Sequence, residues 1–218
     1  MQKFFTDSFE LRTRIIQTCK EMSELGLCIA TWGNISIRLE KNVLITPSRI
    51  DYDKMTEQDM VVVDPDGNKV AGDRLPSSET LLHCELLKSR PDIPVWIHSH
   101  APNSSAFACR HEAIPVIAED MAQIIGGTVN CSEYVPGGRH KELAEAAVLA
   151  LHKEAAAVLL ANHGVIVGGC SLEEALAATL VLEKAAGMML CGAGKVVPIP
   201  DELVKEERFR YLYKYGKE

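Results

Sequence analysis

Apolar residues recur along the chain with two periods, one typical of helices and one typical of strands. After Asp7-Ser8, apolar positions every three or four residues predict an amphipathic helix through about Leu25, and Gly26 is suited to end it. Shorter apolar runs predict strands at 34–39, 43–46, 61–63, 94–97, 156–161 and 165–167. Further helices are predicted at 78–89, 102–109, 121–125, 139–153 and 171–190.

This alternation of helices and strands favours an α/β fold in a single domain that spans residues 1–218. No repeat, low-complexity tract or linker divides the chain. A mixed central sheet with helices on both faces would bury the apolar runs from either side. The tail at about 201–218 is charged and aromatic, and we expect it to lie over a neighbouring surface.

Composition narrows the function classes. The 218 residues carry 23 Lys and Arg against 30 Asp and Glu, a net charge of −7 that disfavours nucleic acid as the main partner. An anionic substrate stays possible, because local N–H groups and one or two cations can hold a phosphate. The absence of a long apolar stretch or signal-peptide core predicts a cytoplasmic protein without a membrane partner. Seven cysteines without a C-x-x-C pair indicate small apolar residues in a reducing compartment.

Three histidines and one glutamate are candidate metal ligands. His98 and His100 follow an apolar run, and alternate residues of a strand share a face, so both imidazoles point the same way. His163 follows another apolar strand, and Glu79 lies at a probable helix start. Glu, His, His and His from three elements fit a catalytic divalent-metal site with exchangeable positions, and zinc is the favoured ion.

Glu79 and a further histidine, His83, have structural alternatives. Glu79 could simply complement a helix dipole, which is worth a few tenths of a kcal/mol to about 1 kcal/mol. His83 lies four residues after Glu79 on the same helix face. It could be a fourth imidazole ligand, a partner that orients Glu79, or a core residue. Because the other ligand set is already complete, we favour the last two roles.

Small, hydroxyl-rich turns occur at three element ends, at 30–34, 46–49 and 77–78. Converging N–H and O–H donors of this kind form an anion cradle, although each turn alone is ordinary turn chemistry. No glycine pattern matches a dinucleotide-binding or P-loop fingerprint.

In order and spacing, six segments between Cys19 and Leu190 resemble the zinc-dependent class II aldolase family (the L-fuculose-1-phosphate aldolase and L-ribulose-5-phosphate 4-epimerase family). The epimerase branch typically carries Asp where this chain has Glu79, which favours an aldolase. The segments are Gly33-Asn34-Ile35-Ser36, Leu44-Ile45-Thr46-Pro47, Leu75-Pro76-Ser77-Ser78-Glu79, His98-Ser99-His100-Ala101, Gly126-Gly127 and Asn162-His163-Gly164.

The resemblance implies a site, a fold and an assembly. It implies one Zn²⁺ per subunit on His98, His100 and His163, with Glu79 as both ligand and acid/base. It also implies a mainly antiparallel sheet and a homotetramer with active sites at subunit interfaces, near which the tail packs. The implied phosphate-binding residues are Thr31, Asn34, Ser48, Ser77 and Ser78.

Three positions depart from the family pattern, and at a fourth the matching residue must be selected from several tyrosines. Asp120 occupies the position of a catalytic Tyr, and Gly137 replaces an aromatic residue near the aldehyde. Arg49 replaces a small Gly beside the phosphate, where its guanidinium can bind the phosphate or a carboxylate. A further family Tyr comes from the tail, where Tyr215 matches better than Tyr211 or Tyr213.

The resulting hypothesis is reversible retro-aldol cleavage of a ketose 1-phosphate, like L-fuculose 1-phosphate, to dihydroxyacetone phosphate and an aldehyde. Zinc would stabilise the enediolate and Glu79 would move the proton on carbon. Alternatives on the same metal site are a 4-epimerase, a decarboxylase of a phosphorylated sugar acid, and a methylthioribulose-1-phosphate-type lyase. A non-catalytic scaffold of this fold would be expected to lose the histidines, and this chain keeps them.

Overall fold

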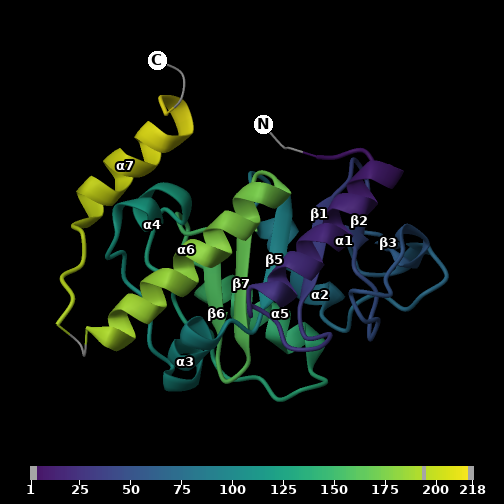
Figure 1. Ribbon diagram of the computed structural model, residues 1–218, viewed down its shortest axis with the longest axis horizontal. Coiled ribbons are helices and arrows are strands. Elements are labelled where there is room, and N and C mark those ends of the chain that lie inside the picture. Colours follow the sequence, from purple (N-terminus) through teal and green to yellow (C-terminus); the bar gives the residue numbers. More distant parts are fainter. Residues whose placement is uncertain (1–3, 193–194, 216–218) are drawn as a thin grey trace.

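The computed structural model describes residues 4–192 and 195–215, and a seven-stranded sheet forms the centre of this described part (Figure 1). The strand order is β4-β3-β2-β1-β5-β7-β6. Each predicted strand is present. The bounds are β1 Asn34–Arg38, β2 Val43–Ile45, β3 Val61–Val63, β4 Lys69–Ala71, β5 Val95–Ser99, β6 Ala157–Leu160 and β7 Gly164–Gly169.

All ladders between the described strands are antiparallel. Short connections join β1 to β2 and β6 to β7, and a hairpin connection pairs strands antiparallel. Parallel pairing occurs in isolated bridges, such as the one between Phe5 and Leu39. The expected mainly antiparallel sheet is therefore confirmed, and the mixed character of the first expectation is limited to those bridges.

Helices cover both faces of the sheet, as predicted. In Figure 1, α1 and α6 cross in front of the sheet, and α2 and α5 lie behind it. Alternate residues of β5 serve the two sides, because Val95 and Ile97 pack in the core with α1 and Trp96 packs in the core with α2 and α5. The bounds are α1 Phe9–Glu24, α2 Thr80–Ser89, α3 Pro102–Arg110, α4 Glu119–Ile124, α5 His140–Ala150, α6 Leu172–Cys191 and α7 Asp201–Tyr213, with a short 3₁₀ turn at Glu57–Asp59.

The tail forms helix α7, which lies away from the histidines of its own chain. Within one chain, α7 does not pack near the histidines: it lies against α4, where the guanidinium of Arg208 donates to the backbone oxygens of Gln123 and Ile124. Val204 is buried in the same contact. α7 also borders the last residues of β7, whereas His163 precedes the first, so the tail and the histidines lie at opposite ends of this strand. Residues 216–218 lie outside the described part.

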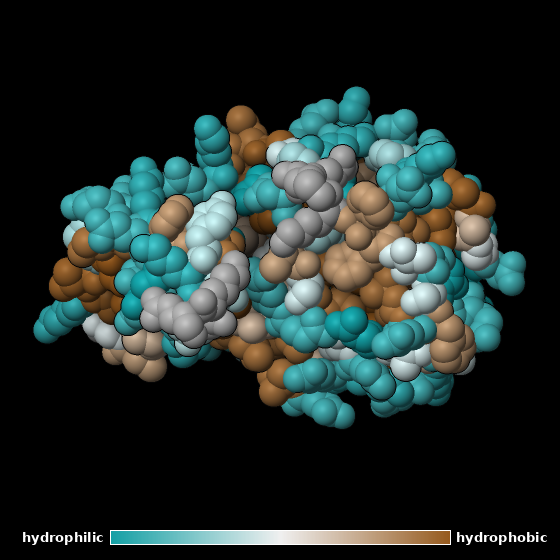
Figure 2. Space-filling view, turned by 90° about the horizontal axis from the view of Figure 1, so that it is seen from above, coloured by the Kyte–Doolittle hydropathy of each residue, from teal (hydrophilic) through white to brown (hydrophobic). Residues whose placement is uncertain are grey.

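One face of the molecule carries both hydrophilic and hydrophobic side chains. Figure 2 views the face near both chain ends, where hydrophilic side chains cover most of the surface and separate hydrophobic patches lie between them. Among the described residues, no helix combines the length and the apolar character needed to cross a membrane.

Candidate active site

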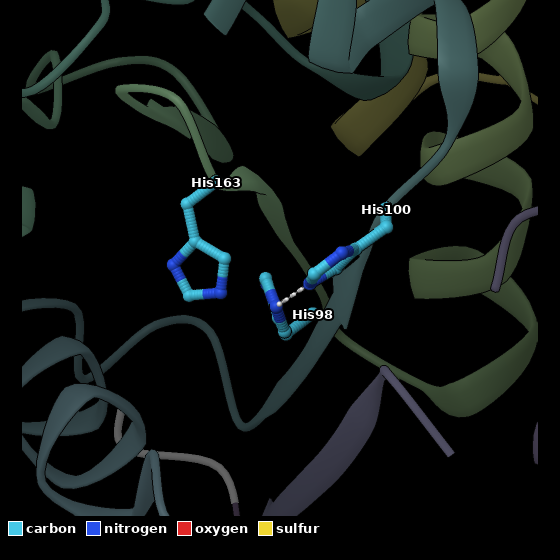
Figure 3. Close-up of side chains that lie close together, drawn as sticks. All are labelled: His98, His100 and His163. Carbon is cyan, nitrogen blue, oxygen red and sulfur yellow. Dashed lines mark hydrogen bonds between the residues drawn. The ribbon is translucent and has the colours of Figure 1, made fainter. Parts of the chain in front are cut away.

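The end of β5 places two imidazoles beside a third from the β6–β7 turn. His98 is buried on β5, between β1 and β7, and lies opposite Asn34 of β1, and His100 follows directly after the strand. Figure 3 shows the rings of His98, His100 and His163 turned toward one another. Their ring centroids are 4.9–5.1 Å apart, and one nitrogen from each lies within 4.8 Å of the others. The predicted histidine cluster therefore forms.

The donor atoms fit a small divalent cation. The Nε2 atoms of His98 and His100 lie 3.0 Å apart, and the Nε2 of His163 lies 3.0 Å from Oε1 of Glu79. A tetrahedral zinc site with Zn–N distances of about 2.0–2.1 Å has edges of about 3.3 Å. Nδ1 of His98 lies 3.0 Å from the carbonyl oxygen of Val165, to which it donates, so Nε2 keeps its lone pair for a metal.

The side chain of Glu79 contacts the histidines and does not cap its helix. It occupies the N-cap position of α2, but its side chain makes no capping hydrogen bond. Its carboxylate lies 3.0 Å from His163 and 3.4 Å from His98, and it accepts a 2.7 Å hydrogen bond from Asn34. The helix-dipole alternative for Glu79 does not account for these contacts.

Burial and neighbouring charges shape the protonation of this cluster. Burial lowers the pKa of His98 and brings the pKa of His100 to about 4, so both imidazoles are neutral near pH 7, as metal ligands must be. Burial alone would raise the pKa of Glu79. Where the pH is low enough to protonate His98, its positive charge, with hydrogen bonds from His163 and Asn34, instead holds that pKa below its usual range. Glu79 is therefore an ionised carboxylate.

A cavity of about 520 Å³ opens beside the cluster and gathers the three hydroxyl-rich turns. All six residues predicted to bind phosphate line it, together with Glu79 and the three histidines. Ser77 has a free donor there, because its Oγ accepts from the Glu79 amide and its O–H can point elsewhere. The lining residues for which the sequence predicts phosphate binding are Thr31, Asn34, Ser48, Arg49, Ser77 and Ser78, and this side of the cavity is called the phosphate side.

Two features of this cavity differ from a simple backbone cradle. The amides of Ser48 and Ser77 already donate to the carbonyl oxygens of Leu75 and Thr46, so hydroxyls and side chains must supply the donors at these positions. Arg49 has φ of +60°, a left-handed conformation that favours glycine. The Gly that the resemblance implies for the family would adopt this conformation without strain. This chain has a positively charged side chain there despite the strain.

A second cavity, of about 340 Å³, continues from the cluster toward α5. It shares Glu79 and His163 with the first cavity and is otherwise lined mainly by the segment from Tyr134 to His140. Gly137 belongs to this lining, so the position where the family carries an aromatic residue is open here. The metal cluster therefore lies between two cavities.

Comparison with known proteins agrees with this site. The sequence model of the family described as "Class II Aldolase and Adducin N-terminal domain" matches residues 13–190. The chain belongs to the class II aldolase family. It is accordingly an enzyme of the aldehyde-lyase type, and its three histidines form the candidate metal site of a class II aldolase.

Named relatives of this class II aldolase differ in substrate. L-fuculose phosphate aldolase of Escherichia coli (strain K12) is 38% identical over 191 residues, covering 88% of this chain and 87% of the relative. A 5-methylthioribulose-1-phosphate/5-deoxyribulose-1-phosphate aldolase of Escherichia coli O45:K1 (strain S88) is also 38% identical, over 78% of each chain. A solved L-fuculose 1-phosphate aldolase superposes with a TM-score of 0.89 at 34% identity, over 95% of this chain and 98% of that one.

The structure does not bring the other predicted catalytic residues of this aldolase to the histidines of the same chain. Asp120 lies on α4, where it forms an ion pair with Lys184. Tyr215 follows α7 and is 64% exposed. Among the described residues, neither belongs to the lining of the two cavities beside His163.

Sequence analysis missed contacts that hold the ligands of this aldolase in place. The ring of Trp32 stacks on His100 with centroids 6.1 Å apart. His111 hydrogen-bonds through Nε2 to Oδ1 of Asn162 at 2.6 Å, and Asn162 adopts a left-handed φ of +54° just before His163. The Asn-His-Gly sequence was a usable signal, because Asn tolerates this conformation better than most residues.

Proposed function

We propose that this class II aldolase reversibly cleaves a ketose 1-phosphate to dihydroxyacetone phosphate and an aldehyde, with one Zn²⁺ per subunit. One observation carries the proposal: the Glu79 carboxylate lies between a histidine cluster of metal-site dimensions and a cavity lined with hydroxyls and Arg49. A substrate with a phosphate at one end and a carbonyl beside it matches that arrangement.

The two cavities suit the two halves of such a substrate. The phosphate would lie among the hydroxyls of Ser48, Ser77 and Ser78, with the positive charge of Arg49 at the rim. The aldehyde half would extend into the second cavity, past His163 toward Gly137. The bond to be broken then lies between the cavities, next to Glu79.

His98, His100 and His163 would hold the cation, which when bound supplies Lewis-acid polarisation of the substrate's carbonyl and hydroxyl oxygens. In the synthetic direction the ionised Glu79 would take a proton from the carbon of dihydroxyacetone phosphate while a second group gives one to the aldehyde oxygen. In the cleavage direction Glu79 in its protonated form would return that proton to carbon while the second group takes one from the hydroxyl. Because Glu79 is ionised, it can act as a base, and its burial limits its contact with bulk water. Its two oxygens, held by His163 and Asn34, fix where that proton is transferred.

The proton on the aldehyde oxygen needs a second group. We propose a homotetramer in which a neighbouring subunit supplies it, with Asp120 and Tyr215 as the candidates. Large apolar and aromatic side chains are exposed on and beside α7, including those of Phe209, Tyr213 and Tyr215, which suits a surface that another subunit covers.

A second substrate is specifically favoured by the relatives. The methylthioribulose-phosphate and deoxyribulose-phosphate aldolase matches as well as the fuculose-phosphate enzyme, at 38% identity, although over less of the chain. The open lining at Gly137 would accept a bulkier or less polar aldehyde half. Epimerase and decarboxylase chemistry on this metal site would also use Glu79, but would not release dihydroxyacetone phosphate.

The test is a product assay on a panel of substrates. Purified protein with Zn²⁺ is incubated with L-fuculose 1-phosphate, 5-deoxyribulose 1-phosphate and 5-methylthioribulose 1-phosphate, and released dihydroxyacetone phosphate is trapped by enzymatic reduction. We expect turnover of at least one substrate, loss of activity with chelator and recovery with Zn²⁺. Isomerised sugar phosphate, or CO₂ from a sugar-acid phosphate, without dihydroxyacetone phosphate would contradict the proposal.

A further inference from the structure

A row of buried polar side chains begins at Asn34, which lines the first cavity, and runs behind Glu79 into the interior. Glu79 contacts Asn34, Asn34 contacts His83, and His83 contacts Ser36. His83 and Ser36 have no exposed surface, and Asn34 is 7% exposed. Buried polar groups are costly unless each is hydrogen-bonded, and here each member is bonded to the next.

The sheet and α2 create this row. Asn34 and Ser36 are two residues apart on β1, so their side chains lie on the same face of the sheet. α2 packs on that face, and its residue His83 spans the two positions. One turn earlier on the same helix is Glu79, the proposed base.

The direction of each hydrogen bond in the row can be assigned by starting at the Glu79 carboxylate, which is an acceptor. The Nδ2 group of Asn34 donates to Oε2 of Glu79 at 2.7 Å, because a carboxylate oxygen is the acceptor of this pair. Oδ1 of Asn34 therefore faces Nε2 of His83 at 2.5 Å, and this Nε2 must carry the hydrogen. Nδ1 of His83 is then an acceptor, and the hydroxyl of Ser36 donates to it at 2.6 Å.

A reversed amide is excluded by its neighbours. If the Asn34 side chain turned over, its oxygen would face the Glu79 carboxylate and its NH₂ would face the N–H of His83. Two acceptors would then meet at one end and two donors at the other. Burial favours the uncharged imidazole and lowers the pKa of His83 to about 3, which agrees with a single hydrogen on this ring.

We propose that His83 is a positioning residue for the proposed base: as the Nε2–H tautomer it holds the amide of Asn34 in the one orientation that donates to Glu79. This inference rests on the proposed function only for the role of Glu79 as base. His83 itself touches neither cavity. Asn34 lines the phosphate-side cavity, and its second Nδ2 hydrogen is available there.

The chemical benefit is a fixed carboxylate. With Oε2 held by Asn34, Oε1 stays beside His163, and the oxygen that exchanges a proton with carbon has one position. Proton transfer by a positioned group contributes about 10²–10⁴-fold to a rate, and misplacement by about 1 Å can cost about 10²-fold. A small rotation of Glu79 would leave the serine hydroxyls and Arg49 of the phosphate-side cavity in place.

The test compares three variants of the full-length, zinc-loaded enzyme. His83→Phe removes both ring nitrogens at similar volume, and we expect kcat to fall about 10- to 100-fold. KM should change less than kcat, because Asn34 is one of six residues predicted to bind the phosphate and, among the described residues, the His83 ring hydrogen-bonds to none of the other five. His83→Gln can still donate to Asn34 and should recover most of kcat. Leu86→Ala, a buried apolar truncation on the same helix, is the matched control: it should lower the melting temperature and leave kcat within about twofold.

A second measurement needs no activity. The ¹⁵N spectrum of His83 imidazole should show the Nε2–H tautomer with and without metal, unchanged between pH 6 and 8, and Ser36→Ala should weaken that preference. An Nδ1–H tautomer would overturn the proposal, as would normal kcat in a folded His83→Phe variant. Equal losses of kcat in Leu86→Ala would overturn it by indicating a general effect of α2. If Glu79→Gln keeps full activity, the proposed function fails, and the tautomer result still stands separately.

Discussion

The two ends of strand β7 are surrounded by different kinds of polar groups. At its first residue, Gly164, a buried carboxylate and three imidazoles converge on a point from three separate elements. A side chain at Gly164 would put its Cβ 2.5 Å from the backbone oxygen of Ser99, so this close approach needs glycine. At its last residue, Gly169, the strand meets the cavity bordered by Asp92, Arg208 and Tyr213.

At the second end of β7, the charged side chains form ion pairs at the protein surface. Asp92 there pairs with Arg90 of the loop before β5, and Arg210 on α7 pairs with Glu119 and Glu207. These are ion pairs with exposed partners, which contribute little to stability. Converging buried groups imply a bound ligand, whereas paired exposed charges imply solubility or assembly. We call the Gly164 end of β7, beside the three histidines, the metal end, and the Gly169 end the α7 end. The following predictions test whether these two ends differ in function.

The largest expected effect is loss of the metal. His98→Ala removes a buried ligand held by Val165, so we expect bound zinc to fall from about one per chain to less than a tenth, with activity falling in step. Elemental analysis of the purified protein measures this directly. His152→Ala, an exposed histidine outside the cluster, is the control and should keep its zinc. Undiminished zinc in His98→Ala would remove the histidines from the metal site.

Glu79→Gln should separate catalysis from metal binding. The amide keeps the size of the side chain and can contact a cation weakly, but it cannot accept a proton. We expect kcat to fall about 10²–10⁴-fold while zinc content and melting temperature stay close to those of the native protein. Steady-state kinetics beside elemental analysis provides the comparison. Near-normal turnover would point to another base.

Arg49 tests the phosphate side of the metal end. Removing a charge-assisted contact worth about 1.5–3 kcal/mol should raise KM about 10- to 100-fold and change kcat less, because the phosphate does not react. Arg49→Gly is the sharper variant, since it also relieves the left-handed backbone at φ +60° and should not destabilise the fold. Arg49→Lys keeps the charge and should lose less. An unchanged KM in Arg49→Gly would leave the phosphate to the serine hydroxyls.

Tyr215 tests whether the α7 end of one chain completes the metal end of another. Tyr215→Phe should lower kcat about 10-fold or more if its hydroxyl moves a proton. Mixed assemblies of Tyr215→Phe and Glu79→Gln subunits should then be more active than either parent, because some sites combine both intact residues. Co-expression with two affinity tags isolates such assemblies. No recovery of activity in the mixed species would contradict a shared site.

The metal end was predictable because strand geometry acts locally. His98 and His100 alternate on a buried strand, so their common direction follows from the sequence alone. The link from Asn34 to Glu79 was not predictable in the same way, because it depends on β1 pairing with β5 so that Asn34 lies opposite His98. That register joins residues more than sixty positions apart, and no local pattern specifies it.

The α7 end gave weaker signals for physical reasons. α7 buries one residue of the described helix, Val204, so it lacks the apolar stripe by which helices are recognised. β4 is an exposed edge strand with a Lys-Val-Ala sequence and no buried face, and it was missed. In the proposed homotetramer the positions of Asp120 and Tyr215 relative to a site would depend on a neighbouring subunit, which a single sequence does not encode as a pattern.

The smallest expected effect belongs to the α7 end and has a pH signature. Hydrogen bonds from Arg90 to both oxygens of Asp92, at 2.9 and 2.7 Å, lower the pKa of this carboxyl in the folded protein. A lowered folded pKa stabilises the protein above the unfolded value of about 3.9, and this contribution is lost as the pH falls through the folded pKa.

Asp92→Asn should therefore cost about 0.2–1 kcal/mol of unfolding free energy at pH 7, because the Asp92 carboxylate is largely exposed, and less at pH 3. Urea unfolding at the two pH values measures the difference. Zinc content, kcat and KM should all equal those of the native enzyme, since the pair lies at the far end of β7 from the histidines. A loss of turnover without a loss of zinc would mean that this end takes part in catalysis, and the division between the two ends would fail.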